Sequence, residues 1–278
     1  MPVKIVTDSA ADLPADQAEA HGIAVVPLTI RFGDESYVDG VDLSPQEFYD
    51  KMAATEVLPA TAAPSPGAFE EAFRAAGADG DPVVCINLSA ALSATMQSAE
   101  AAAKALAGEI EVRVVDSGSI TAGLGMSVLA AAAVAESGGS ADDVVAEVER
   151  LRDHTKVFGA LDTLENLKKG GRIGGAQAMI GSILSIKPII DISTGAVTEA
   201  GKQRTRRKAL VWLRDKLFEA GDVRDVAVAH GCSDDVEELI KLIEPRYSRD
   251  DITVWTIGPV IGAHGGPRVM GLVWHDAD

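Results

Sequence analysis

The alternation of short apolar strands with helices over the first 155 residues is the feature that most constrains the fold. Residues 4–7, 82–88 and 111–116 each have the length and composition of a buried strand, and a helical pattern follows each of them. Strands that alternate with helices form parallel, doubly wound sheets, which bind their ligands beyond the carboxyl ends of the strands. We therefore expect an α/β fold with a mostly parallel N-terminal sheet.

Helix starts are marked by a capping serine followed three residues later by an acidic side chain, or directly by proline. These signals predict four helices in the N-terminal part, and they involve Ser9 with Asp12, Ser44 with Pro45 and Glu47, Ser65 with Pro66, and Ser140 with Asp143. A further alanine-rich helix is expected to begin near Ser93, and residues 24–31 are expected to form one apolar strand.

The second half of the chain differs in pattern from the first. Residues 161–175 contain two Gly-Gly pairs, and residues 186–192 and 196–200 predict a hairpin around Gly195. Alternating strands and helices then continue to the last predicted strand, residues 269–274. We expect two lobes, an α/β lobe of residues 1–155 and an α+β lobe of residues 156–278.

Composition limits the classes of partner. The 278-residue chain is 47% hydrophobic and has a formal net charge of −17, which disfavours nonspecific binding to nucleic acid or an anionic membrane. The longest apolar run, residues 128–135, is far below the roughly 20 residues that span a bilayer. We expect a cytoplasmic monomer with no nucleic-acid partner and no stable membrane insertion.

Cofactor and metal motifs are not found in the sequence. It has neither a P-loop pattern nor a strand-borne GxGxxG, so we expect no cofactor. Cys85 and Cys232 lack metal-ligand spacing, and we interpret both as buried thiols in a reducing compartment. The acidic residues that could suggest a metal site are better explained as caps and solvated turns, and they are Asp8, Asp39, Asp42 and Asp116.

Three residues are candidates for an anion-binding site. His264 lies in GPVIGAHGGP, residues 258–267, whose four glycines and two prolines are typical of a loop that approaches a ligand closely. Thr61 and Ser93 lie at helix entrances, where hydroxyls, backbone amides and helix dipoles favour anions. Plain capping explains most hydroxyls at such positions. Together the three indicate a clamp for a carboxylate.

A small serine hydrolase is the alternative. Ser93, His264 and either Asp8 or Asp116 supply the residue types of a catalytic triad. The sequence has no GxSxG elbow, which weakens this interpretation.

Two further groups of residues have more than one interpretation. The apolar face made by Met179, Ile180, Ile183 and Leu184 indicates either core packing or the lining of a channel for an apolar ligand. The basic cluster of residues 202–208 is either a solvated face or a docking surface for an acidic partner. It contains Lys202, Arg204, Arg206, Arg207 and Lys208.

Seven segments, in this order, resemble the DegV family of bacterial fatty-acid-binding proteins. The similarity extends over nearly the whole chain, and the segments are VTDSAADLP, TAAPSPGAF, LSAALSATMQSA, VVDSGSITAGLGM, LDTLENLKKGGRIGG, KPII and GPVIGAHGGP. The resemblance implies a two-lobe fold with one fatty acid in a tunnel between and within the lobes, and its carboxylate at the lobe junction. It also implies a carrier without catalytic activity, which presents the fatty acid to an ATP-dependent kinase that makes acyl phosphate for phospholipid synthesis.

Carried onto this chain, the family's carboxylate clamp falls on Thr61, Ser93 and His264. Arg172 and Arg204 also match family positions, and Arg206 and Arg207 are expected to share a role in docking the kinase. The sequence departs from the family pattern near the clamp, at Ala62, Ala94, Ala263, Gly265 and Arg268. Ala62, Ala263 and Gly265 stand where the family has hydroxyl side chains, so these changes remove donors near the expected carboxylate, and Ala94 stands where the family usually has glycine. The changes bear on affinity and ligand identity.

Overall fold

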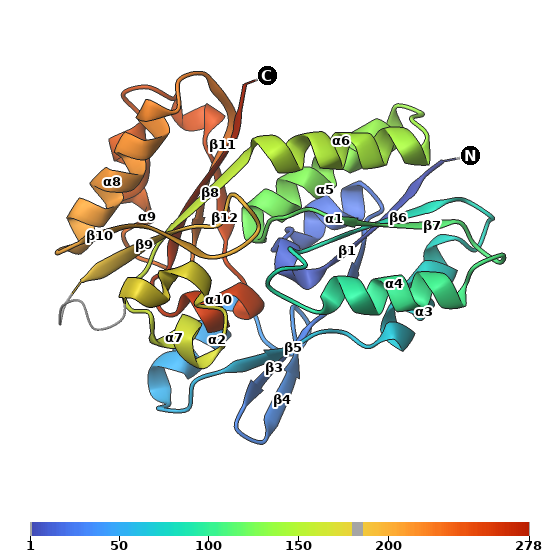
Figure 1. Ribbon diagram of the computed structural model, residues 1–278, viewed down its shortest axis with the longest axis horizontal. Coiled ribbons are helices and arrows are strands. Elements are labelled where there is room, and N and C mark those ends of the chain that lie inside the picture. The colour runs from blue at the N-terminus through green and yellow to red at the C-terminus, as the bar shows by residue number, and fades with distance from the viewer. Residues whose placement is uncertain (1, 180–185, 278) are drawn as a thin grey trace. The chain divides into compact units, whose positions relative to one another are not determined.

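The computed structural model describes residues 2–179 and 186–277 (Figure 1). The chain divides into two compact units, the first made of Met1–Thr29 and Ala62–Asp153, and the second of Ile30–Thr61 and His154–Asp278. Residues 30–61 and 154–155, which the prediction assigned to the lobe of residues 1–155 and not to that of residues 156–278, belong to the second unit. Each unit has its own sheet.

The first unit contains the predicted parallel sheet. Its strand order is β2-β1-β6-β7 and every neighbouring pair is parallel. The strands are β1 (Lys4–Asp8), β2 (Ala24–Val26), β6 (Val83–Asn87) and β7 (Val112–Asp116). Figure 1 shows helices on both sides of these strands, among them α4 and α5, which confirms the predicted α/β class.

The helices of the first unit are α1 (Ala15–Ala20), α3 (Pro66–Ala76), α4 (Thr95–Ala105), α5 (Thr121–Glu136) and α6 (Ala141–His154). The helices α3, α4 and α5 pack against this sheet, whereas α1 has no buried residue. Phe69 and Phe73 of α3 are fully buried among strand residues such as Val6 and Cys85. Ser65 caps α3, and Ser140 and Asp143 exchange hydrogen bonds at the start of α6, as the sequence predicts.

Asp8 corrects the first of the predicted helix starts. Its carboxylate accepts hydrogen bonds from the backbone N–H of Ala10 and Leu88 and from the Asn87 amide, at 3.1, 2.9 and 3.0 Å. Asp8 rather than Ser9 is the cap, and it begins only a short 3₁₀ turn, Ser9–Ala11. Through these bonds the carboxylate joins the ends of β1 and β6 and does not lie in a solvated turn. Its burial raises the pKa of Asp8 to about 6.

The second unit contains a mixed six-stranded sheet of order β10-β9-β8-β13-β11-β12. The strands are β8 (Thr155–Ala160), β9 (Lys187–Asp191), β10 (Thr198–Gln203), β11 (Val223–His230), β12 (Thr253–Thr256) and β13 (Met270–Asp276). β9 and β10 form the predicted antiparallel hairpin, and α8 (Arg206–Glu219) and α9 (Val236–Ile243) pack in the same core. Cys232 follows β11 and is only half-buried, so its prediction as a buried thiol was wrong.

A smaller three-stranded sheet of order β4-β3-β5 is formed mainly by residues 30–61, the N-terminal segment that belongs to the second unit. Its strands are β3 (Thr29–Phe32), β4 (Glu35–Val38) and β5 (Ala60–Ala62). Residues 24–31 are therefore not one strand, because β2 pairs in the first sheet and β3 in this one, with Pro27 between them. The helix α2 (Pro45–Ala54) lies between β4 and β5 and begins with the predicted Ser44–Glu47 capping box.

Candidate functional site

His264 lies on a short helix and not on the predicted loop. The helix α10 (Pro259–Gly265) has Gly258 as its N-cap and Pro259 in its first turn. Proline at the first helical position needs no N–H partner, and Gly266, with a φ of 78°, ends the helix in a conformation that disfavours other residues. The glycines and prolines of this segment therefore delimit a helix, and His264 occupies its last turn.

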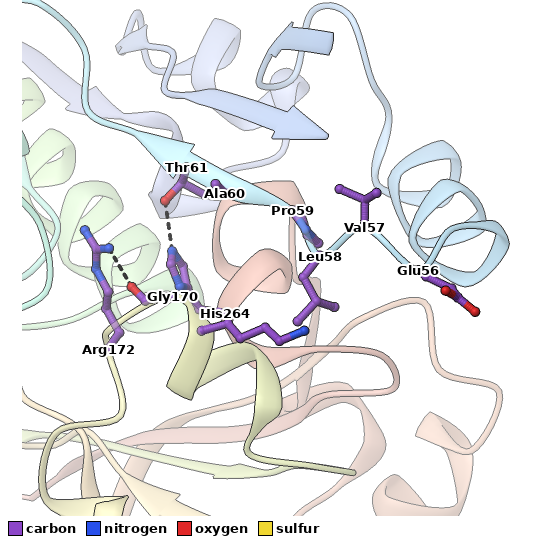
Figure 2. Close-up of a pocket in the computed structure, with 10 residues that line it drawn as sticks. Glu56, Val57, Leu58, Pro59, Ala60, Thr61, Gly170, Arg172 and His264 are labelled. Carbon is purple, nitrogen blue, oxygen red and sulfur yellow. Dashed lines mark hydrogen bonds between the residues drawn. The ribbon is translucent and has the colours of Figure 1, made fainter. Parts of the chain in front are cut away.

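Thr61 and His264, predicted as ligands of one carboxylate, contact each other directly. The Thr61 Oγ1 atom on β5 lies 2.9 Å from Nε2 of His264, although the two residues are 203 positions apart in sequence. Figure 2 shows the two side chains pointing toward one another across the end of α10. The second unit thus contains two of the three predicted clamp residues as a hydrogen-bonded pair.

Gly170 provides the space that the His264 ring occupies. It follows α7 (Glu165–Lys169) as the C-cap and has right-handed helical backbone angles. A Cβ atom added to Gly170 would lie 2.4 Å from Nδ1 of His264. The first Gly-Gly pair of the sequence therefore permits close approach of the imidazole to the backbone. This role was not predicted, because the motif reveals the glycine but not the neighbour.

Burial keeps His264 neutral near pH 7. Burial, and secondarily the positive charge of Arg172, lowers the pKa of His264 from 6.5 to about 4. Nδ1 is buried without a hydrogen-bond partner in the described chain. If the single proton of the neutral ring sits on Nε2, this N–H donates to Thr61 Oγ1 and Nδ1 is an unpaired acceptor. This arrangement is more tolerable than an unpaired buried N–H donor at Nδ1. This tautomer leaves the Thr61 hydroxyl proton available for a ligand.

The pKa of His264 predicts a pH dependence of stability. The unfolded chain binds a proton near pH 6.5 and the folded chain only near pH 4, so acidification through this window favours unfolding. Between pH 7.5 and pH 5 the contribution amounts to about 2 kcal/mol. The test compares the free energy of unfolding of the wild type with that of His264→Gln. The other titrating groups are common to both proteins, so an equal pH dependence in the two would contradict the buried neutral histidine.

The Thr61–His264 pair borders a cavity of about 470 Å³ in the second unit (Figure 2). Arg172 contributes a positive charge, and its Nη1 donates to the Gly170 carbonyl at 2.7 Å. Val57 and Leu58 contribute apolar surface. The residues that line the cavity are Glu56, Val57, Leu58, Pro59, Ala60, Thr61, Lys169, Gly170, Arg172 and His264. Polar donors beside an apolar wall suit an amphipathic anion.

Ser93, the third predicted clamp residue, lies in the first unit. Its Oγ accepts a hydrogen bond from the Thr95 N–H at 3.2 Å and lies 2.8 Å from Thr95 Oγ1. Ser93 precedes α4, which begins at Thr95, two residues later than predicted. Its participation in one clamp with Thr61 and His264 stays a prediction.

The four arginines predicted for partner docking have different surroundings. Arg172 lines the cavity, and Arg204 is exposed between β10 and α8. Arg207 is exposed and lies 3.4 Å from Glu238. The side chain of Arg206 is only 13% exposed, and it forms a bidentate ion pair with Asp235, at 2.8 and 3.0 Å. Arg206 therefore has a structural partner within its own unit.

The predicted channel face can be followed only in part. Met179 ends the 3₁₀ segment Gly174–Met179 and is 1% exposed. Ile180, Ile183 and Leu184 lie outside the described residues. Contact of this face with a ligand therefore stays a prediction.

The hydrolase hypothesis finds no support in these contacts. Ser93 pairs with Thr95, and Nε2 of His264 pairs with Thr61. No orienting carboxylate contacts Nδ1 of His264 among the residues that the structure describes, whereas a hydrolytic triad needs one there.

Among the helices of the described residues, none is both long and apolar enough to cross a bilayer.

Comparison with known proteins defines the family. The family model described as "Uncharacterised protein, DegV family" matches residues 2–277. A DegV domain-containing protein of Streptomyces coelicolor is 38% identical over 278 residues, which cover 98% of this chain and 97% of that protein. The chain therefore belongs to the DegV family.

Solved members of the family have the same fold. A DegV family protein from Thermus thermophilus, described for its fatty acid binding, is 36% identical, and the match covers 100% of both chains with a TM-score of 0.90. A stearic acid-binding protein from Eubacterium ventriosum is 29% identical, and the match covers 99% of this chain and 98% of that chain with a TM-score of 0.89. The predicted family and two-lobe fold class are thus confirmed.

Proposed function

We propose that this chain binds a long-chain fatty acid, holds its carboxylate with Thr61, Ser93 and His264, and presents it to a separate fatty acid kinase. The observation that carries the proposal is the Thr61–His264 pair beside Arg172 at one cavity. The family supports it, because solved relatives with the same fold are described as fatty-acid-binding proteins.

The carboxylate contact follows from the protonation of the pair. The neutral His264 donates from Nε2 to Thr61 Oγ1, so the threonine hydroxyl turns its proton toward the cavity. A carboxylate oxygen accepts that proton, and the charge of Arg172 favours the ionised ligand. His264 orients the donor without carrying a charge of its own.

The acyl chain supplies most of the affinity in this proposal. Each buried CH₂ contributes roughly 0.8 kcal/mol, so a long chain outweighs any single hydrogen bond, and the polar residues set orientation. Val57 and Leu58 of the cavity wall are candidate contacts near the carboxylate. Met179, Ile180, Ile183 and Leu184 remain the proposed lining farther along the tail.

Replacement of Thr61 tests the carboxylate contact. Thr61→Val keeps the shape and removes the hydroxyl, and the lost bond to a charged group should weaken fatty-acid binding about 10-fold. Thr61→Ser keeps the hydroxyl and serves as the control, with affinity close to that of the wild type. The fatty alcohol of equal chain length lacks the charged oxygen, so it should bind wild type and Thr61→Val with similar affinity. Equal affinity of Thr61→Val and wild type for the fatty acid would remove Thr61 from the clamp.

Transfer to a kinase requires a surface that orients the encounter. Arg204 and Arg207 are exposed positive charges at the start of α8 in an acidic protein, and Arg172 lies beside the proposed carboxylate. Such complementarity raises the rate of association and is screened by salt. Arg206 contributes mainly by holding this helix end through Asp235.

Arg204→Glu should slow acyl-phosphate formation and reduce its dependence on salt, while fatty-acid affinity stays the same. The measurement is a coupled assay with the kinase across ionic strength, at saturating fatty acid. Arg113→Glu, which reverses an exposed charge in the first unit, is the matched control and should behave as the wild type does. Identical rates for Arg204→Glu and wild type at every salt concentration would exclude the cluster from docking.

A further inference from the structure

Asn166 lies on α7, at the point where α7, α10 and α2 meet. Its side chain is buried, with 3% of the residue exposed. The Nδ2 group donates a hydrogen bond to the Ala263 carbonyl at 3.0 Å, across 97 residues of sequence. It also lies 3.9 Å from the Met52 sulfur of α2. The amide therefore joins α7 to α10 directly and contacts the helix that leads to Thr61.

The hydrogen bond acts on the residue next to His264. The carbonyl of Ala263 belongs to the last turn of α10, where carbonyl groups run out of partners within the helix. The side-chain amide of Asn166 supplies a donor there and fixes the position of this turn. Since the imidazole projects from the following residue, its direction depends on that turn.

The backbone of Asn166 acts on the opposite side of the ring. Its carbonyl accepts the N–H of Gly170 at 2.9 Å, and this bond ends α7. Gly170 is the residue that lies against Nδ1 of His264. One residue thus fixes both the turn that carries the imidazole and the backbone against which the imidazole packs.

We propose that Asn166 is the positioning residue of this site, which holds the His264 ring at the Thr61 hydroxyl. The effect on ligand affinity rests on the proposed fatty-acid function, whereas the effect on the ring does not. Asn166 was not among the candidates from the sequence, where it is one polar residue of LDTLENLKKGGRIGG.

Two variants test the proposal. Asn166→Leu keeps a similar volume and removes the donor. Asn166→Asp keeps the shape, loses the donor when ionised and regains one when protonated, so it should recover toward the wild type as the pH falls. Ile243→Val, at a fully buried position of α9, is a control for general loss of stability.

The first measurement is the NMR titration of the His264 ring in the ligand-free protein. A His264→Gln spectrum identifies its signals among the five histidines. We expect the pKa to rise from about 4 toward 6.5 in Asn166→Leu, and to stay low in Ile243→Val. Unchanged His264 signals in folded Asn166→Leu and Asn166→Asp would overturn the proposal.

The second measurement is the affinity of the same proteins for a long-chain fatty acid. Asn166→Leu should bind about 10-fold more weakly, comparable to the loss of one hydrogen bond to a charged group. A displaced ring with unchanged affinity would overturn the proposal if His264→Ala does weaken binding. If neither Asn166→Leu nor His264→Ala changes the affinity while the ring of Asn166→Leu is displaced, Asn166 is supported as the residue that positions the ring, and the role of His264 in holding the carboxylate is what fails.

Discussion

Replacing Gly170 by alanine is expected to weaken fatty-acid binding by roughly 100-fold, the upper end of what a lost hydrogen bond to a charged group costs. The backbone angles of Gly170 suit alanine, so the substitution requires no change of φ or ψ. The new Cβ would lie 2.4 Å from Nδ1 and 2.8 Å from Cε1 of His264. The ring must move away, and its bond to Thr61 breaks. Overpacking should also lower the free energy of unfolding by about 1 to 3 kcal/mol.

The control for this prediction comes from the same motif. A Cβ at Gly175 would meet its neighbours no closer than 3.5 Å, so Gly175→Ala should bind fatty acid as the wild type does. The double variant Gly170→Ala with His264→Ala removes the ring that is displaced. The double variant should regain stability relative to Gly170→Ala alone, because the clash is gone and the two neighbouring substitutions are therefore not additive. It should not regain affinity, because the ring is absent. Calorimetric binding and unfolding measurements on the four proteins decide the matter. Wild-type affinity of Gly170→Ala would show that the ring does not need this position.

Replacing Asp235 by alanine is expected to destabilise the protein by roughly 3 kcal/mol, the lower end of what a broken buried ion pair costs. The side chains of Asp235 and Arg206 are only 14% and 13% exposed. Asp235 also accepts from Ser233 Oγ at 2.6 Å and from Arg268 at 3.1 Å. Without the carboxylate, the charge of Arg206 loses its bidentate partner while its side chain remains largely buried.

Asp234 provides a matched control one residue away. It is 91% exposed and lies 3.8 Å from Arg268, so Asp234→Ala should change stability by no more than about 0.5 kcal/mol. The measurement is the free energy of unfolding by urea at pH 7. Equal losses from the two substitutions would contradict a special role of the buried pair.

The pH dependence gives a second reading of the same pair. Burial alone would raise the pKa of Asp235, but hydrogen bonds from Arg206 and Ser233 and the charges of Arg206 and Arg268 hold it at about 2. The stabilisation is complete above the ordinary value of 3.8 and is lost as the pH falls through 3.8 toward 2. The difference between wild type and Asp235→Ala should therefore narrow only below about pH 4.

The sequence by itself determined the local elements and the residue types of the site. The capping box at Ser44 and Glu47 lies within four consecutive residues, and it begins α2 as predicted. Alternating strands and helices predicted the parallel sheet. Thr61 was a candidate because it lies at a helix entrance, and His264 because it lies in a segment rich in glycine and proline. All these signals act over a few residues, so they can be read along the chain.

Only the tertiary structure decided how those residues meet. Gly170 and Asn166 gain their roles from His264 and Ala263, which are far away in sequence, and no local pattern encodes that proximity. Positive charge at the start of a helix opposes the helix dipole, so the sequence offers no structural reason for Arg206 at the start of α8. The ion pair with Asp235, which lies 29 residues away, supplies that reason. The glycine-rich segment of residues 258–267 forms a helix because α10 packs against α2 and α7. Packing between distant segments fixes these features, and it outweighs the local preferences that the sequence displays.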